Sequence, residues 1–212
     1  MNAIGEDARV VVVRTGSANL ASVRAAFTRL AVETIVTDDP QAVVEARAAV
    51  LPGVGAFGPA MTRLRARGLD EAIVERCRRG SPLLAICLGL QLLCESSEES
   101  VGVTGLGVVG ASVGRFAGTA RVPQMGWNRI EAAGDGGMLR SDWMYFANSY
   151  RLEQVPGAWR VTTTEHGGTF VSAIERGSLL ACQFHPELSG QGGLALLERW
   201  LLKALAREEA SC

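Results

Sequence analysis

The segment 81–95, Ser-Pro-Leu-Leu-Ala-Ile-Cys-Leu-Gly-Leu-Gln-Leu-Leu-Cys-Glu, restricts the possible folds more than any other part of the chain. Its unbroken apolar run, Leu83 to Ile86, is typical of a strand buried on both faces of a parallel sheet. From Leu88 onward apolar residues recur at helical spacing, so the chain is predicted to turn sharply at Cys87. A side chain at such a strand–turn–helix junction is held exposed by the turn.

Two roles for Cys87 are open on this segment alone. Ala85 and Gly89, two residues before it and two after it, are small enough for the strand and the helix to pack closely. The start of the helix supplies unpaired N–H groups and positive potential, which favour a thiolate. Free cysteine is also among the most buried residue types, so an unreactive core cysteine is the alternative.

A second apolar run, Leu179 to Phe184, is followed by His185-Pro186-Glu187, which contains one of the two histidines of the chain. Proline ends the strand and fixes the backbone, so His185 and Glu187 are expected at a rigid corner beyond the sheet edge. A cysteine nucleophile needs a base, and the base needs a carboxylate that orients it. His-Pro-Glu by itself would suit a solvated loop. The two strand ends together predict a catalytic triad of Cys87, His185 and Glu187.

The motifs at these strand ends resemble those of the triad-type class I glutamine amidotransferases. They are Ala-Ile-Cys-Leu-Gly-Leu-Gln at 85–91 and Gln-Phe-His-Pro-Glu at 183–187. Three further stretches narrow the resemblance to the glutaminase subunits of imidazole glycerol phosphate synthases, of histidine biosynthesis. These are Leu-Pro-Gly-Val-Gly-Ala-Phe-Gly at 51–58, Val-Pro-Gln-Met-Gly-Trp-Asn at 122–128 and Tyr-Phe-Ala-Asn-Ser-Tyr at 145–150. The resemblance covers nearly the whole chain, from about residue 11 to residue 201.

The resemblance implies that glutamine is hydrolysed to glutamate and ammonia without a metal or organic cofactor. It also implies that the ammonia is delivered to a cyclase subunit of the (β/α)8-barrel type. By resemblance, Gln91 holds the substrate glutamine, Glu99 meets its ammonium group, and Ser149 and Tyr150 flank its carboxylate. Gln91 lies one helical turn after the candidate nucleophile, so its amide can face the same pocket. From the residues alone Gln91 is equally an ordinary helix residue, and the segment 95–99 is expected to be a solvated loop.

The loop Gly53-Val54-Gly55-Ala56-Phe57-Gly58 matches the pattern G-x-G-x-x-G. A dinucleotide site of this form follows the first strand of its unit, and an acidic residue about 20 positions later closes the next strand. Here the loop follows the third predicted strand, and Glu71 and Glu75 lie in a helical pattern, which disfavours a nucleotide cofactor. The preferred interpretation is an oxyanion site, in which N–H groups of Val54, Gly55 and Leu88 stabilise developing negative charge. A plain glycine turn is the alternative.

Strands and helices alternate in the first half of the chain, which predicts an α/β fold. We expect a single domain over residues 1–212, with a mostly parallel central sheet and flanking helices. Short runs between 102 and 176 are interrupted by Gly, Pro and Asp and predict a more antiparallel section. The expected strands lie at 10–13, 33–37, 48–51, 83–86 and 179–184. Helices are expected at about 20–30, at 40–47, from residue 88, and at 193–207. Ser17 or Asn19 is expected to cap the first helix, and Leu197, Trp200 and Leu201 of the last helix are expected in the core.

The composition argues against several classes of function. The 212 residues carry a net charge of −1, which gives no electrostatic basis for binding nucleic acid. No apolar run approaches the ~20 residues of a membrane span, and the polar start of the chain does not suit a signal peptide. Five cysteines form no Cys-x-x-Cys pair, which argues against a zinc site or a redox dithiol. Their placement suits a reducing cytoplasm.

The chain departs from the family it resembles at four places. Arg14 to Asn19 stands where Asp-Tyr-Gly-x-Gly-Asn is usual, Gln124 and Asn148 stand where histidine is usual, and Leu188 replaces a usual lysine. These segments face or lie near the cyclase in the family. One hypothesis is therefore a working glutaminase with an altered docking face, and the other is neutral drift with the original partner. A paralogous glutaminase that feeds a different synthase and a non-catalytic regulatory homologue are further alternatives, although the intact triad weighs against the regulator.

Overall fold

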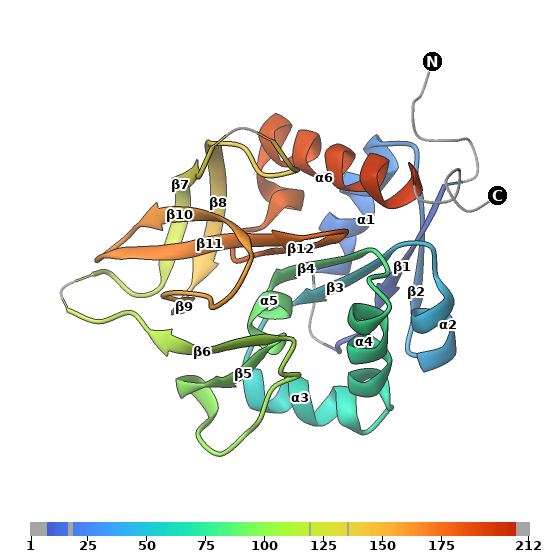
Figure 1. Cartoon of the computed structure of the whole chain (residues 1–212), viewed down its shortest axis with the longest axis horizontal. Helices are drawn as coiled ribbons and strands as arrows, with labels where there is room; N and C mark the ends of the chain where they lie inside the picture. The colour runs from blue at the N-terminus through green and yellow to red at the C-terminus, as the bar shows by residue number, and fades with distance from the viewer. Residues whose placement is uncertain (1–7, 17–18, 119, 135, 207–212) are drawn as a thin grey trace.

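The computed structural model describes residues 8–16, 19–118, 120–134 and 136–206, and it has the predicted α/β architecture (Figure 1). The strands are β1 (Arg9–Val13), β2 (Glu33–Thr37), β3 (Ala49–Gly53), β4 (Leu83–Cys87), β5 (Cys94–Ser97), β6 (Val109–Arg115), β7 (Gln124–Ala132), β8 (Asp142–Asn148), β9 (Tyr150–Leu152), β10 (Arg160–Glu165), β11 (Thr169–Arg176) and β12 (Leu179–Cys182). The helices are α1 (Leu20–Arg29), α2 (Pro40–Glu45), α3 (Phe57–Arg65), α4 (Leu69–Arg78), α5 (Leu88–Leu92) and α6 (Gly190–Leu205), with short 3-10 helices η1 (Glu98–Ser100) and η2 (Pro186–Leu188).

The central sheet has a parallel half and an antiparallel half, as the sequence predicts. Its strand order is β2-β1-β3-β4-β12-β11-β10-β7-β8, and β5, β6 and β9 form a branch that joins the path at β11. The neighbours from β2 to β12 are parallel, whereas each pair from β12 onward to β8 is antiparallel. Carboxyl ends of parallel strands meet at one edge of a sheet. The strands β3, β4 and β12 therefore bring the loops that follow them together.

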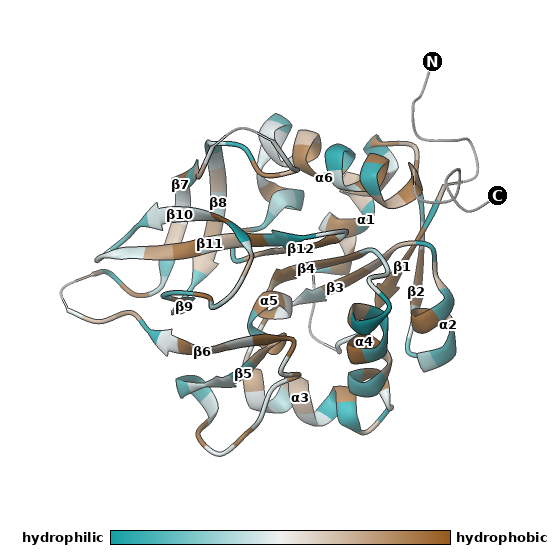
Figure 2. Cartoon of the chain, viewed as in Figure 1, coloured by the Kyte–Doolittle hydropathy of each residue, from teal (hydrophilic) through white to brown (hydrophobic). Residues whose placement is uncertain are grey.

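Two apolar cores cover the two faces of the parallel half. On one face Phe27 of α1 and Trp200 of α6 pack edge to face, with ring centroids 6.3 Å apart, which confirms that α6 faces the core. On the other face α3 and α4 pack against the sheet (Figure 1). Every residue of β4 is buried, since alternate side chains enter the two cores. Figure 2 shows the same division, with hydrophobic central strands and hydrophilic residues on the outer sides of the helices.

The segment 95–99 is not the predicted solvated loop. Cys94–Ser97 forms β5, which pairs with β6, and the next residues form η1. Glu98 accepts the N–H of Arg115 at 2.7 Å, and Glu99 accepts the N–H of Phe57 at 2.7 Å. The prediction of a loop was wrong because the segment pairs with β6 and because backbone N–H groups from distant segments donate to Glu98 and Glu99.

The element ends differ from prediction by a few residues. The strand β12 ends at Cys182 rather than at 184, and α6 begins at Gly190 rather than at 193. Asn19 caps α1, and its side-chain oxygen accepts the N–H of Ser22 at 3.3 Å. The alternative cap, Ser17, lies outside the described residues. Among the helices described, none is long and apolar enough to cross a membrane.

Candidate active site

Cys87 ends β4 and directly precedes α5, in the sharp turn that its sequence predicts. Its backbone has φ +54° and ψ −108°, a conformation that non-glycine residues rarely adopt. Gly89 makes this turn possible, because a Cβ atom there would overlap the carbonyl oxygen of Leu51 on the neighbouring strand β3. The predicted close packing of strand and helix is confirmed, and Cys87 lies on the wall of a cavity.

His185 and Glu187 meet at the end of the adjacent strand. The Nδ1 atom of His185 lies 2.8 Å from Oε1 of Glu187, and both side chains are almost completely buried. The backbone of His185 is also fixed, because its N–H donates to the carbonyl of Tyr145 at 2.9 Å and its carbonyl accepts the hydroxyl of Ser189 at 2.6 Å. The corner beyond β12 is therefore as rigid as Pro186 predicts.

The imidazole of His185 is held in its charged form. Burial by itself lowers the pKa of His185, but hydrogen bonds to the side chains of Cys87 and Glu187 raise it to about 10. His185 thus contacts the sulfur on one side and the carboxylate on the other. The structure brings the three predicted triad residues together, with His185 between the sulfur of Cys87 and the carboxylate of Glu187.

The cavity in front of Cys87 has a volume of about 250 Å³ and gathers the other predicted site residues. Its lining residues are Val54, Gly55, Cys87, Leu88, Gln91, Glu99, Ala147, Asn148, Ser149, Tyr150 and His185. Glu187 stands behind His185, outside this lining. Gly55 has φ +94°, which lets the loop after β3 turn beside the sulfur. Leu88 is the first residue of α5, so its N–H has no acceptor within the helix.

The side chains of Gln91 and Glu99, which line the cavity, form hydrogen bonds within the protein. The side-chain nitrogen of Gln91 donates to Oε1 of Gln183 at 3.0 Å and to the carbonyl of Tyr150 at 3.5 Å. One oxygen of Glu99 is held by the N–H of Phe57. These contacts fix the direction in which both polar groups face the cavity.

Sequence reasoning missed Gln183 as part of this site. Its side-chain nitrogen lies 3.6 Å from the sulfur of Cys87, so it contacts the candidate nucleophile directly. The signal was a single polar residue between Cys182 and Phe184 in an otherwise apolar run. Asn148, which the sequence marks only as a departure from the family, also lines the cavity.

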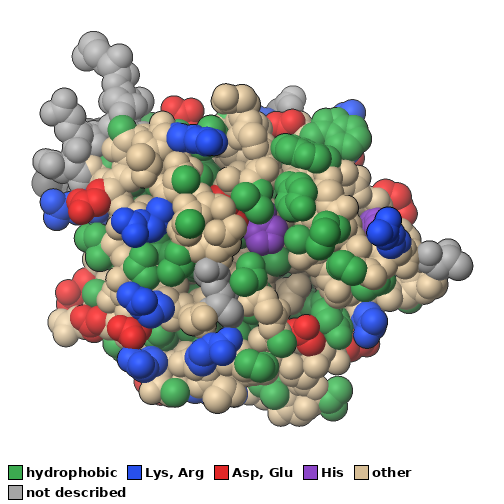
Figure 3. Space-filling view, turned by 180° about the vertical axis from the view of Figure 1, so that it is seen from behind, with side chains coloured by type: hydrophobic (Ala, Val, Ile, Leu, Met, Phe, Trp, Pro, Cys, Tyr) green, Lys and Arg blue, Asp and Glu red, His purple; other side chains and the backbone are tan. Residues whose placement is uncertain are grey.

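An exposed apolar surface adjoins the site, and we call its residues Met125, Trp127, Trp143 and Leu188 the apolar face. Their exposed fractions are 68%, 55%, 55% and 39%. The first three lie on the paired strands β7 and β8, and a Cβ at Gly190, next to η2, would touch Trp127. Figure 3 shows hydrophobic side chains gathered around a central histidine on this side of the molecule.

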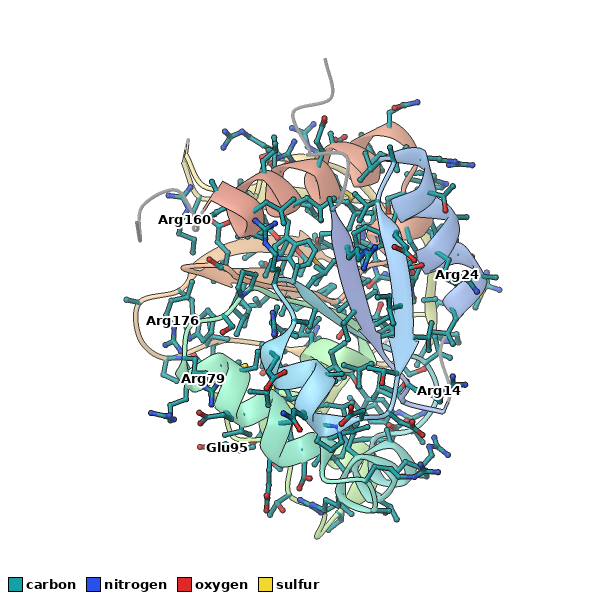
Figure 4. The ribbon with its side chains drawn as sticks, turned by 90° about the vertical axis from the view of Figure 1, so that its right-hand side faces the viewer. Arg14, Arg24, Arg79, Glu95, Arg160 and Arg176 are labelled. Carbon is teal, nitrogen blue, oxygen red and sulfur yellow. The ribbon has the colours of Figure 1, made fainter. Side chains whose placement is uncertain are left out.

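The four departures from the family do not share one environment. The side chains of Gln124 and Asn148 are buried opposite each other on β7 and β8. Leu188 is exposed, and Arg14 is exposed at the carboxyl end of β1 (Figure 4). Leu188 and Arg14 can therefore contact a docked partner directly. Gln124 and Asn148 are buried and can affect docking only through the residues packed around them.

Within the described part of the chain, no three His, Cys, Asp or Glu side chains are grouped so that they could hold a metal ion. The four cysteines that the structure describes, Cys77, Cys87, Cys94 and Cys182, are free thiols.

Comparisons with known proteins show the family of the chain. The family model for glutamine amidotransferase class-I matches residues 12–204. The chain is 43% identical to the imidazole glycerol phosphate synthase subunit HisH of Symbiobacterium thermophilum over 197 residues, which is 91% of this chain and 93% of that protein. It is 40% identical to the chloroplastic imidazole glycerol phosphate synthase hisHF of Arabidopsis thaliana over 204 residues, 92% of this chain and 34% of that protein.

Solved structures show the same fold at lower identity. A crystal structure of a glutamine amidotransferase matches with a TM-score of 0.74 and 23% identity, over 92% of this chain and 98% of the other. The glutaminase domain of CTPS from Trypanosoma brucei matches with a TM-score of 0.66 and 16% identity, over 94% of each chain. With the sequence relatives, these findings show that the chain belongs to the class-I glutamine amidotransferase family and, within it, to the HisH subunits of imidazole glycerol phosphate synthase.

Proposed function

We propose that this chain is the glutaminase subunit of an imidazole glycerol phosphate synthase in histidine biosynthesis, and that Cys87, His185 and Glu187 hydrolyse glutamine. The observation that carries the proposal is the assembled triad, in which His185 contacts both the sulfur of Cys87 and, at 2.8 Å, the carboxylate of Glu187. The whole chain, 1–212, acts as one glutaminase domain. No metal or organic cofactor takes part.

The reaction begins when the sulfur of Cys87 attacks the side-chain carboxamide carbon of glutamine. The carbonyl oxygen becomes an oxyanion, which the N–H groups of Leu88 and the Val54–Gly55 region stabilise. His185 donates its proton to the departing nitrogen, the C–N bond breaks, and ammonia leaves a thioester on the sulfur. His185 then removes a proton from water, whose oxygen attacks the thioester carbon. The C–S bond breaks, the sulfur leaves as a thiolate, and the new carboxylic acid gives its proton to solvent as glutamate. The proton stays on His185 and restores the starting pair.

The substrate occupies the cavity in front of the sulfur. A volume of about 250 Å³ lies below the ~300–1,000 Å³ of pockets for drug-sized ligands and suits one amino acid. We assign Gln91 to holding the glutamine, Glu99 to its ammonium group, and Ser149 and Tyr150 to its carboxylate. Glu99 supplies the negative charge that an ammonium needs, and the N–H of Phe57 holds it in place.

The ammonia must pass to a partner, because ammonia released into neutral water becomes ammonium and is no longer a nucleophile. The relatives are named as synthase subunits, and the hisHF name of the Arabidopsis protein joins two subunit designations. We propose a (β/α)8-barrel cyclase that docks on the apolar face. That face adjoins the site, since Tyr145 of β8 accepts the N–H of His185.

A diverged partner is the alternative that one observation favours. Leu188 is 39% exposed in the apolar face, at a position where lysine is usual in the family. Replacing a charge by an apolar side chain removes a possible ion pair and changes partner choice. Neutral drift with the original cyclase remains the simpler interpretation, because one rim residue rarely redirects a whole interface.

The proposal is tested by replacing the nucleophile. Cys87→Ala should abolish glutamate release from glutamine, while Cys77→Ala, which changes a half-buried cysteine outside the cavity, should leave it intact. In a complex with the cyclase, ammonium salts at alkaline pH should still support synthesis by Cys87→Ala. Full glutaminase activity in that variant would overturn the assignment of the nucleophile.

A further inference from the structure

Gln183 is a fully buried polar side chain that the proposed reaction does not use. Its exposed fraction is 0%, so its amide has to find its hydrogen-bond partners inside the protein. Its side-chain nitrogen faces the sulfur of Cys87 at 3.6 Å, and its side-chain oxygen accepts the amide N–H of Gln91 at 3.0 Å. An apolar residue could fill the same space without the cost of burying an amide.

The neighbouring groups fix which end of the Gln183 amide faces the sulfur. The carbonyl of Tyr150 can only accept hydrogen bonds, so the end of Gln91 that faces it must be the NH2 group. The same nitrogen also faces Gln183, which therefore presents its oxygen to Gln91. The remaining end of Gln183, the NH2 group, is left to point at Cys87. Asn148 also donates to the Tyr150 carbonyl, at 3.0 Å, and holds the start of this chain of contacts in place.

An N–H group directed at sulfur distinguishes between the two forms of the thiol group. A thiolate accepts a charge-assisted hydrogen bond, which is about twice as strong as a neutral one. The other donor, His185, gives its proton away during the reaction. An amide does not titrate, so the N–H of Gln183 stays directed at the sulfur throughout the cycle.

We propose that Gln183 is a positioning residue that holds the sulfur of Cys87 as a thiolate, and that Gln91 orients the Gln183 amide for this purpose. The inference rests on the proposed role of Cys87 as nucleophile. It gives Gln91 a second task besides contact with substrate, and it connects the cavity wall to the reactive atom through two hydrogen bonds.

The test is the pH dependence of alkylation of Cys87 by iodoacetamide in the absence of glutamine, with the modified residue identified by fragment mass spectrometry. Gln183→Met keeps the length of the side chain but has no donor. We expect the midpoint of the alkylation rate to move up by about 1 pH unit, since one charge-assisted hydrogen bond corresponds to roughly a tenfold change in an equilibrium. A purely structural role would lower thermal stability without moving the midpoint.

Thr162→Val is the matched control. It removes a buried hydroxyl contact of 2.9 Å with Ser172, whose carbonyl accepts the N–H of Gln183, but it does not touch the sulfur. It should lower stability and leave the alkylation midpoint unchanged. If Gln183→Met does not fold, Gln183→Leu serves instead, because it also removes the N–H donor without adding a charge, so the midpoint should again rise.

An unchanged midpoint in a folded Gln183 variant would overturn the inference and leave the nucleophile assignment standing. Glutaminase activity in Cys87→Ala would instead overturn the proposed function. The two failures are therefore distinguishable, since the first is read from alkylation and the second from glutamate release.

Discussion

Cys87 is held in a strained backbone conformation by its neighbours. A non-glycine residue in a rare φ/ψ region costs about 1–3 kcal/mol and persists only where the surroundings enforce it. Here the packing of Gly89 against the carbonyl of Leu51 enforces it, and a Cβ at Gly53 would come within 2.9 Å of Leu88. Gly53 of β3 and Gly89 of α5 thus allow β3 and α5 to approach closely beside Cys87, which lies on the wall of the cavity.

The protonation of His185 makes the stability of the protein depend on pH. Its pKa in the folded protein is about 10, above the ordinary value of 6.5. A raised pKa means that the protonated form stabilises the fold. This contribution is fully present below about pH 6.5 and is lost as pH rises to about 10.

Removing the carboxylate beside His185 should lower that pKa. In Glu187→Gln we expect the alkaline decline of glutaminase activity to begin at lower pH than in the wild type, since the imidazolium loses its charged partner. The measurement is kcat/KM against pH between about 6 and about 11, a range that spans the ordinary and the raised pKa of histidine. Glu33→Gln, which removes an exposed carboxylate paired with Arg9, is the control and should not shift the profile. Identical alkaline declines for Glu187→Gln and the wild type would show that Glu187 does not govern the protonation of His185.

At the scale of elements, a buried arginine joins α4 to the end of α2. Arg76 is fully buried, and its guanidinium donates hydrogen bonds to backbone carbonyls. The acceptors are the carbonyls of Val43, Val44, Ala46 and Pro82. Burial lowers the pKa of Arg76 to about 10, so it remains charged at neutral pH. Arg76 therefore caps α2 and supports the turn that leads into β4.

Arg76→Met should destabilise the protein without altering the chemistry. Unpaired buried carbonyls cost about 1–3 kcal/mol each, so the free energy of unfolding should fall by about 3 kcal/mol or more. Arg78→Met is the control, because Arg78 lies on the same helix in an exposed pair with Glu75, and its replacement should change stability far less than that of Arg76. Denaturant titration measures both. Equal losses would contradict the role given to Arg76.

At the scale of the whole molecule, Met125, Trp127 and Trp143 of the apolar face lie on the antiparallel half of the sheet, and Cys87 lies on the parallel half. The two meet where β12 leads to His185, whose N–H donates to the carbonyl of Tyr145 on β8. A partner that docks on the apolar face would therefore touch the strand that holds the backbone of His185, the proposed base. If the proposed cyclase docks on the apolar face, it can act on the active site through Tyr145 and His185.

Trp127→Ala should weaken binding of the cyclase. Large aromatic side chains dominate interface energies, so we expect the Kd to rise by at least about tenfold, while basal hydrolysis stays near wild type because Trp127 does not line the cavity. Val101→Ala, which changes a residue that is 93% exposed elsewhere, is the control. The variant Leu188→Lys tests the hypothesis of a diverged partner. That hypothesis predicts that Leu188→Lys binds a standard histidine-pathway cyclase more tightly than the wild type does. Unchanged affinity for Trp127→Ala would remove the apolar face from the interface.

The fold class and the strand-end positions of Cys87 and His185 could be predicted from the sequence because each depends on local pattern. The catalytic roles of Cys87, His185 and Glu187 stay predictions. The apolar run before Cys87 and the proline after His185 act within a few positions along the chain. Gly89 is marked by its spacing from Cys87, although its close neighbour is Leu51 on β3. Alternating strands and helices have few parallel arrangements available to them. The cavity residues taken from the resemblance, such as Gln91 and Glu99, do line one cavity, and their roles toward the substrate stay predictions.

Tertiary structure alone decided the contacts between residues far apart in the chain. Gln183 reaches Cys87 across 96 positions only because β12 lies beside β4 in one particular register. The segment 95–99 looks solvated in sequence, yet the N–H groups of Phe57 and Arg115 take up its carboxylates. The physical reason is the same in both cases. A polar side chain does not encode its partner, and only the packed sheet determines which backbone or amide group arrives next to it.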